Sequence, residues 1–296
     1  MVDTADFLDD KRKRDDAMPG RIVPAFVYKL PWWLITLILI GLFALILILT
    51  DETFGRIFEQ LREGIAMTLG VSVIAYISAL IVGLVVGLIR SRPPQVPEPG
   101  TPPLRQLRSL AHTFLYNILT LYVEMLRGLP VLVVLLIVAF VLVPEIKNVL
   151  NASFGIELQF RGSSPTSAVI ALAFTYGAFI SETFRAGIQS IERGQIDAAL
   201  SVGMTRVQAM RYVILPQAVR RILPPLGNDM VAMVKDSSLV AILGVRDITQ
   251  VAKTASGRSF LYMETYLMVA VIYLTMTIIG SLFVKWIERR MKQTEF

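Results

Sequence analysis

Six stretches of this chain are apolar over lengths that approach or exceed the ~20 residues that a helix needs to cross the hydrocarbon core of a membrane. Only 18% of the residues are charged, against roughly 25% in soluble domains. The sequence therefore predicts an all-α integral membrane protein with about six bilayer crossings. The six apolar runs are Trp33–Leu49, Ile65–Ile89, Phe114–Val143, Ser167–Phe184, Ile222–Val245 and Tyr262–Trp286.

The net charge of +6 indicates topology and not affinity for nucleic acid. With the N-terminus placed inside, the inside segments carry 19 Lys and Arg residues and the outside segments carry 7. Cytoplasmic loops of membrane proteins carry this excess of positive charge. We therefore expect both termini to be cytoplasmic, with the lipid bilayer as a partner and no nucleic acid partner.

Two polar segments lie before and after the first two apolar runs. Residues 1–30 mix Asp, Lys and Arg without apolar periodicity, which predicts a cytoplasmic N-terminal tail ahead of a first transmembrane helix at 31–50. Residues 91–103 are so rich in Pro that they predict an extended cytoplasmic linker. Between them, Gly83 and Gly87 stand one helical turn apart and favour close packing of helices.

Ionisable residues interrupt three of the apolar runs, where an isolated charge costs ~2.5–3.5 kcal/mol. Such side chains must face protein or water. The backbone is also interrupted there, because Pro130 removes a hydrogen bond and Ser237 and Ser238 favour capping. A polar cavity with both signs of charge suits a zwitterion such as an amino acid. The predicted substrate-path residues are Glu124, Arg127, Glu182, Lys235, Asp236, Ser237 and Ser238. Two pairs of opposite charge, Glu124 with Arg127 and Glu182 with Arg185, are each spaced three residues apart on one helical face.

A cytoplasmic hairpin is predicted at 189–216, between the fourth and fifth apolar runs. Ala198 and Ala199 leave little side-chain bulk, so another surface could approach the backbone. The chain is expected to turn at Gly203, and Pro216 is expected to end the second helical arm. By spacing alone, this segment could be a simple connector.

This hairpin resembles the EAA loop in permease subunits of bacterial ABC importers, whose pattern is Glu-Ala-Ala, three residues, Gly, nine residues and Ile-x-Leu-Pro. The residues that match are Ala198, Ala199, Gly203, Leu215 and Pro216, with Asp197 in place of Glu and Val213 in place of Ile. Further motifs resemble the polar amino acid (histidine/glutamine/arginine) branch of that family, and the likeness covers 64–290. These motifs are Glu124–Pro130, Gly177–Ile188 and Lys235–Leu239.

The resemblance implies a type I ABC importer transmembrane domain, with a five-helix core and one extra N-terminal transmembrane helix. It implies a subunit of the bacterial inner membrane that forms the path for an amino acid substrate. The implied partners are a cytoplasmic ATP-binding subunit dimer that contacts the hairpin, a second permease, identical or homologous, and an external substrate-binding protein. The chain has no Gly-x-x-x-x-Gly-Lys-Ser/Thr motif, so ATP and Mg are expected on the partner ATPase.

Three other classes of protein were considered. An ion-coupled secondary amino acid carrier could use the buried carboxylates as a proton relay, and it would not need the hairpin motif. An intramembrane hydrolase is disfavoured, because the chain has no Cys, no zinc motif and only His112, which is expected at the membrane interface. We therefore expect no catalytic residues and no metal site. A membrane scaffold would leave the buried charges unexplained.

Overall fold

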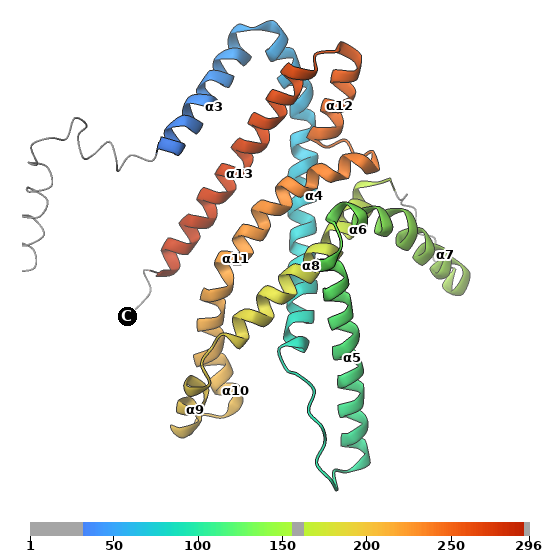
Figure 1. The fold of residues 1–296 in the computed structure, drawn as a ribbon, viewed down its shortest axis with the longest axis vertical. Helices are drawn as coiled ribbons and strands as arrows, with labels where there is room; N and C mark the ends of the chain where they lie inside the picture. The colour runs from blue at the N-terminus through green and yellow to red at the C-terminus, as the bar shows by residue number, and fades with distance from the viewer. Residues whose placement is uncertain (1–31, 156–162, 293–296) are drawn as a thin grey trace, which may run out of the picture. The chain divides into compact units, whose positions relative to one another are not determined.

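The structure is a computed structural model that describes residues 32–155 and 163–292. The described residues form helices joined by turns and, between α4 and α5, by the non-helical linker at 91–102, without strands. The elements, coloured along the chain in Figure 1, are α3 (Trp32–Thr50), α4 (Glu52–Arg90), α5 (Pro103–Gly128), α6 (Val131–Ile137), η1 (Val138–Leu142), α7 (Val143–Phe154), α8 (Pro165–Gln189), α9 (Arg193–Ser201), α10 (Arg206–Ala209), η2 (Met210–Ile214), α11 (Leu215–Asp236), η3 (Ser237–Leu243), α12 (Ile248–Ser259) and α13 (Tyr262–Lys292).

The chain divides into two compact units, Met1–Asp51 and Glu52–Phe296. In the first unit, helix α3 is an uninterrupted apolar segment of 19 residues without a charged side chain. Several of its large side chains are exposed, as expected for a helix that faces lipid. The predicted tail at 1–30 lies outside the described residues.

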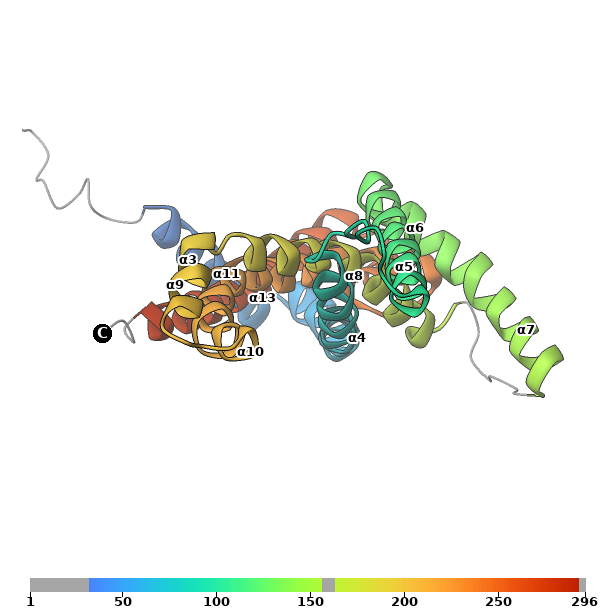
Figure 2. The same cartoon turned by 90° about the horizontal axis from the view of Figure 1, so that it is seen from below.

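In the second unit, α8 crosses α4 obliquely and packs closely against it (Figure 1 and Figure 2). A Cβ atom added at Gly83 would lie 2.5 Å from Ile180 Cγ2, and one added at Gly87 would lie 2.7 Å from the backbone oxygen of Ser181. The absence of side chains at these glycines therefore lets the two helices approach closely. The small-residue face that the sequence contains serves packing inside this unit.

Helices α11 and α13 also approach closely at a glycine, since a Cβ atom at Gly227 of α11 would lie 2.2 Å from Val284 Cγ1. Helix α12 packs on α4, where a Cβ atom at Gly64 would meet the Ile248 backbone nitrogen at 2.6 Å.

Asp247 caps the start of α12 and accepts hydrogen bonds from Gln250 N (2.9 Å) and Tyr273 Oη (3.2 Å). Burial raises the pKa of the Asp247 carboxyl above its ordinary value.

Four described helical segments are long and apolar enough to cross a membrane, and a fifth, Leu34–Thr50, is apolar but shorter. Six crossings were expected from the apolar runs. The two expected runs that are not among the four are Trp33–Leu49, which forms the shorter helix, and Ile222–Val245, which lies in part on α11, a helix with several charged residues. The four segments are Glu52–Arg90, Val131–Phe154, Pro165–Gln189 and Tyr262–Met291.

Two of the predicted apolar runs are broken where the sequence contains Pro130 and Ser237. Leu129 is extended (φ −102°, ψ 146°), since the residue before a proline is disfavoured in the helical region, and the run Phe114–Val143 therefore divides between α5 and α6. The run Ile222–Val245 leaves α-helix at Asp236 and continues as the 3₁₀ helix η3 to Gly244.

The predicted hairpin at 189–216 contains α9, a turn, α10 and η2, which lie at the end of α8 and α11 that is opposite to α12 (Figure 1). Gly203 turns the chain with φ +84°, a backbone conformation that side-chain-bearing residues rarely adopt. Thr205 and Gln208 then form a capping box that starts α10.

The prediction that Pro216 ends the second arm is wrong. The chain stays helical from α10 through η2 into α11, and Pro216 lies in the first turn of α11. The proline lies just after the π-helical turn η2, and the missing N–H hydrogen bond falls at this irregular turn, where the helix continues and does not end. The hairpin is therefore continuous with α11.

Candidate functional site

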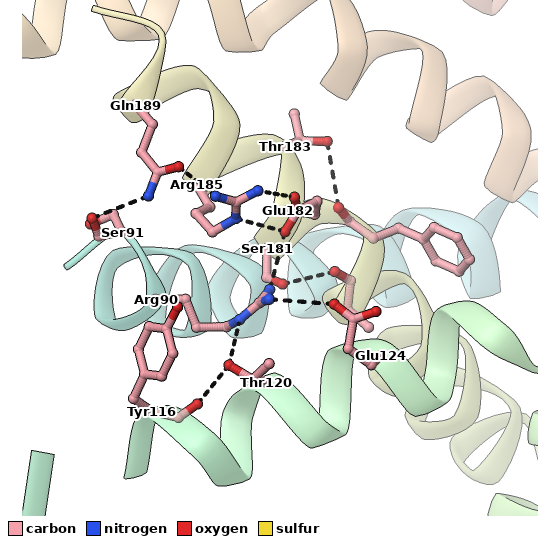
Figure 3. A network of polar contacts seen from close by, with 12 residues as sticks. Arg90, Ser91, Tyr116, Thr120, Glu124, Ser181, Glu182, Thr183, Arg185 and Gln189 are labelled. Carbon is pink, nitrogen blue, oxygen red and sulfur yellow. Dashed lines mark hydrogen bonds and ion pairs between the residues drawn. The ribbon is translucent and has the colours of Figure 1, made fainter. Parts of the chain in front are cut away.

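A network of charged side chains joins α4, α5 and α8 where α4 ends (Figure 3). Its centre is Arg90, whose side chain is only 6% exposed. The guanidinium lies 3.1 Å from Glu182 Oε2 through Nη1, and 3.8 Å from Glu124 Oε1 through Nη2. Its Nε donates to Thr120 Oγ1 at 3.3 Å. Arg90 thus places a positive charge between carboxylates of two other helices.

Glu182 also binds a second guanidinium, that of Arg185 on the same helix. Arg185 Nε donates to Glu182 Oε2 at 2.9 Å, and its Nη2 contacts the other carboxylate oxygen. Arg185 also donates to Gln189, whose amide donates to the backbone oxygen of Ser91 at 3.4 Å (Figure 3). Glu182 is therefore compensated from two sides, and the network links α8 to the residue that follows α4.

These contacts differ in one respect from the pairing that the sequence indicates. Glu182 and Arg185 form an ion pair, as their spacing suggests. Glu124, however, pairs with Arg90 rather than with Arg127. Sequence reasoning missed Arg90 because this residue was counted only among the positive charges of the inside segments. Gly83, Gly87 and Arg90 are spaced one helical turn apart and therefore share one face of α4. Because the two glycines mark that face as the one packed against another helix, the same spacing could have indicated that Arg90 is buried there.

A cavity of about 450 Å³ opens beside this network, between α5, α8 and α11. Arg127 and Glu182 line it together with Asp229 of α11. Asp229 Oδ2 is buried, and within the described part of the chain it has no hydrogen-bond partner. The cavity therefore presents two guanidinium groups and two carboxylates in one space. Its other lining residues are Phe179, Thr183, Ala186, Gly187, Ser190, Arg221 and Pro225.

Asp229 is a further residue that sequence reasoning missed. It lies within the apolar run Ile222–Val245, four residues after Pro225. An acidic residue at that depth was a signal of the same kind as Glu124. Pro224 and Pro225 lie inside α11 and remove two backbone N–H donors from the helix. Such irregular backbone is tolerated in a membrane where it lines a cavity.

The four candidate residues near the end of α11 do not line this cavity. Asp236 accepts a hydrogen bond from Tyr176 Oη of α8 at 2.7 Å. Ser237 is buried, and its hydroxyl donates to the backbone oxygen of Val234 at 2.8 Å. Lys235 is exposed and Ser238 is half-buried. The structure thus separates these four residues from Arg127, Glu182 and Asp229.

The hairpin residues of the predicted coupling loop are mostly accessible. Asp197, Ala198, Gly203, Leu215 and Pro216 are exposed, and only Ala199 is buried. Ala198 thus presents its small side chain outward, while Ala199 packs inward. No group of three or more His, Cys, Asp or Glu among the described residues could hold a metal ion.

Comparison with known proteins places these features in a family. Residues 109–293 match the model of the family described as binding-protein-dependent transport system inner membrane component. The glutamine transport system permease protein GlnP of Escherichia coli (strain K12) is 32% identical over 232 residues, which are 78% of this chain and 93% of GlnP. The arginine transport system permease protein ArtQ of Bacillus subtilis (strain 168) is 29% identical over 79% of this chain and 93% of ArtQ.

Solved structures agree with this result. A chain from the crystal structure of an amino acid ABC transporter with histidines matches with a TM-score of 0.62 and 32% identity, over 80% of this chain and 97% of that one. A chain of the MetNI methionine ABC transporter in an inward-facing conformation shares the fold at a TM-score of 0.58 and 17% identity, over 78% of this chain and 96% of that one.

Proposed function

The chain belongs to the family of binding-protein-dependent transport system inner membrane components, and from this premise we propose that it is the permease subunit of an ATP-driven amino acid importer. The observation that carries the proposal is the likeness to amino acid permeases along nearly their whole length, such as the 93% of GlnP that is matched. The cavity supports it, because two guanidinium groups and two carboxylates share one space of about 450 Å³. Ligand pockets commonly have volumes of this order.

The proposed substrate contacts follow from charge. An amino acid in the cavity would place its carboxylate against Arg127 and its ammonium group against Asp229, whose buried Oδ2 has no partner among the described residues. Glu182 lines the same space, but Arg90 and Arg185 already compensate it. We assign Glu124 to holding Arg90. Lys235, Asp236, Ser237 and Ser238 would shape the path at the end of α11.

The proposed partners follow from the hairpin and the charge distribution. We assign the residues of 189–216 to docking on a cytoplasmic ATP-binding subunit dimer, which carries ATP and Mg. Both termini would then lie in the cytoplasm, as the excess of Lys and Arg favours. A second permease and an external substrate-binding protein complete the importer.

Coupling follows from the continuity of the hairpin with α11. Since α10, η2 and α11 form one helical segment, a displacement of the hairpin by the ATPase would move α11 as a body. Helix α11 carries Asp229 on the cavity and Asp236 beyond it. Closure of the ATPase dimer would thereby change which side of the membrane the cavity faces.

The proposal is tested by uptake into liposomes. The full-length chain is purified with the subunits that travel with it, reconstituted with ATP inside, and supplied with the external binding protein and labelled amino acids. We expect uptake that requires internal ATP and persists when an uncoupler dissipates the ion gradients. If the chain alone takes up amino acids under an ion gradient and the uncoupler abolishes this uptake, the protein is an ion-coupled carrier. Nothing in the family comparison favours that alternative.

Asp229→Asn tests the cavity in the same assay. A hydrogen bond to a charged group contributes about 1.5–3 kcal/mol, so we expect the substrate concentration for half-maximal uptake to rise about tenfold or more. The basal ATP hydrolysis should be unchanged. Glu145→Gln, which neutralises an exposed acid on α7, is the control and should behave as the unaltered protein. An unchanged half-maximal concentration for Asp229→Asn would remove Asp229 from the substrate contacts.

A further inference from the structure

One wall of the substrate cavity is a single face of α11. Arg221, Pro225 and Asp229 follow each other at four-residue spacings, so they share this face, and all three line the cavity. At the rise of an α-helix, the backbone positions of Arg221 and Asp229 are about 12 Å apart along the axis. Arg127 of α5 lines the same space. The cavity therefore offers charged contacts at both ends of this face.

Glu182, which also lines the cavity, is balanced by the network that holds it (Figure 3). Its carboxylate contacts the guanidinium groups of Arg90 and Arg185. Arg90 in turn contacts Glu124. Two arginines and two glutamates thus cancel, and the network adds no net charge to the cavity.

The other three charges of the cavity are not compensated. Neither Arg127 nor Arg221 takes part in the ion pairs of the described residues. Arg221 Nη1 donates to the backbone oxygen of Ser190, an uncharged acceptor on the α8 side of the cavity. Glu288 of α13 lines a neighbouring hollow together with Arg221, but within the described chain no ion pair joins the two. Asp229 Oδ2 is buried without a partner among the described residues.

The free charges of the cavity are therefore two positive and one negative. From this balance we propose that the substrate is an acidic amino acid such as glutamate or aspartate, an inference that rests on the proposed function as an amino acid importer. Its α-carboxylate binds Arg127, and its ammonium group binds Asp229. Its side-chain carboxylate binds Arg221. A guanidinium group suits this role, because it can bind both oxygens of a carboxylate at once.

The same balance separates acidic amino acids from the other classes. An acidic amino acid has a net charge of −1, which neutralises the free charges of the cavity. A neutral amino acid lacks the second carboxylate, so it forgoes the ion pair with Arg221. A basic amino acid would place a positive side chain beside Arg221, and like charges repel each other. Arg221 is thus the residue that sets the preference among amino acids.

Binding of amino acids to the full-length chain, purified with the subunits that travel with it, tests the substrate class. Isothermal titration without the external binding protein ensures that the preference belongs to the permease. We expect glutamate to bind about tenfold or more tightly than glutamine, which has the same size and lacks only the charge. Glutarate, which is glutamate without its ammonium group, should bind about tenfold or more weakly than glutamate, because nothing then pairs with Asp229.

Two variants at neighbouring residues locate the preference. Arg221→Gln should lower the affinity for glutamate about tenfold or more, so that the preference over glutamine is lost. Arg220→Gln removes the same charge from the next residue, which does not line the cavity, and should keep the preference. A monodisperse elution profile establishes that each variant is folded.

Four results would overturn the proposal. Equal affinities for glutamate and glutamine, or a preference for arginine, would exclude an acidic substrate. Equal losses in Arg221→Gln and Arg220→Gln would reduce the preference to general surface charge. Equal binding of glutarate and glutamate would exclude the pairing of Asp229 with an ammonium group. Absence of binding by every amino acid would exclude the site itself.

The proposed function is decided separately by the uptake assay. An importer of neutral or basic amino acids would still require internal ATP for uptake, so the substrate class can fail while the importer stands. Loss of all ATP-driven amino acid uptake would overturn both.

Discussion

Replacing Gly203 with valine is expected to lower ATP-driven uptake about tenfold or more while the chain still inserts and folds. Gly203 adopts φ +84°, where a residue with a Cβ atom is strained by about 1–3 kcal/mol. A strain of 1.4 kcal/mol disfavours the required loop geometry tenfold. Nothing lies within 4 Å of the position where a Cβ atom would stand, so the effect arises from the backbone and not from a clash.

The measurement is uptake and ATP hydrolysis by the reconstituted importer, with two matched variants. Asparagine tolerates a positive φ better than valine, so Gly203→Asn should recover part of the uptake. Gly100 also has a positive φ, +91°, with open space around it, but it lies in the linker. Gly100→Val therefore introduces a similar strain outside the hairpin and should leave uptake unchanged.

The two activities separate the possible causes. If Gly203→Val hydrolyses ATP but does not import, the hairpin transmits the ATPase motion, as proposed. If its uptake equals that of Gly100→Val, then the turn at Gly203 has no part in coupling, and the assignment of residues 189–216 to the ATPase contact fails.

Replacing Arg90 with methionine is expected to destabilise the protein by about 3 kcal/mol. Removing one partner of a buried ion pair typically costs about 3–5 kcal/mol, because the other charge is left uncompensated. The lower end is expected here, since Glu182 keeps its contact with Arg185 and the Glu124 side chain is 65% exposed. The three helices that meet at Arg90 would then lose their common contact.

Thermal unfolding of the purified chain, followed as loss of the monodisperse fraction on heating, measures this effect. Arg90→Lys keeps the charge but not the forked geometry and should be intermediate. Arg62→Met breaks the Arg62–Glu59 pair on the same helix, where both side chains are about 60% exposed, and should change stability by roughly 0–1 kcal/mol. Equal unfolding temperatures for Arg90→Met and Arg62→Met would show that Arg90 does not hold the helices together.

Much of this protein could be predicted from sequence because membrane insertion depends on local composition. Apolar runs long enough to span hydrocarbon require helices, since no other open structure satisfies its backbone hydrogen bonds there. The break before Pro130 and the turn at Gly203 were equally readable, because proline and glycine act on their own backbone and that of their neighbours. The family likewise followed from residues close together in the chain.

Tertiary structure alone decided how the charges are distributed among partners. Glu124 pairs with Arg90, which is 34 positions away, and not with Arg127 on its own helical face. Asp229 joins Arg127 at one cavity, although the helices α6, α7 and α8 and the hairpin separate them in the chain. Pro216 was expected to end a helical arm, but it lies within a helix that continues into α11. Which charges meet depends on how closely α4, α5, α8 and α11 pack and in what rotation, and no local pattern encodes that choice.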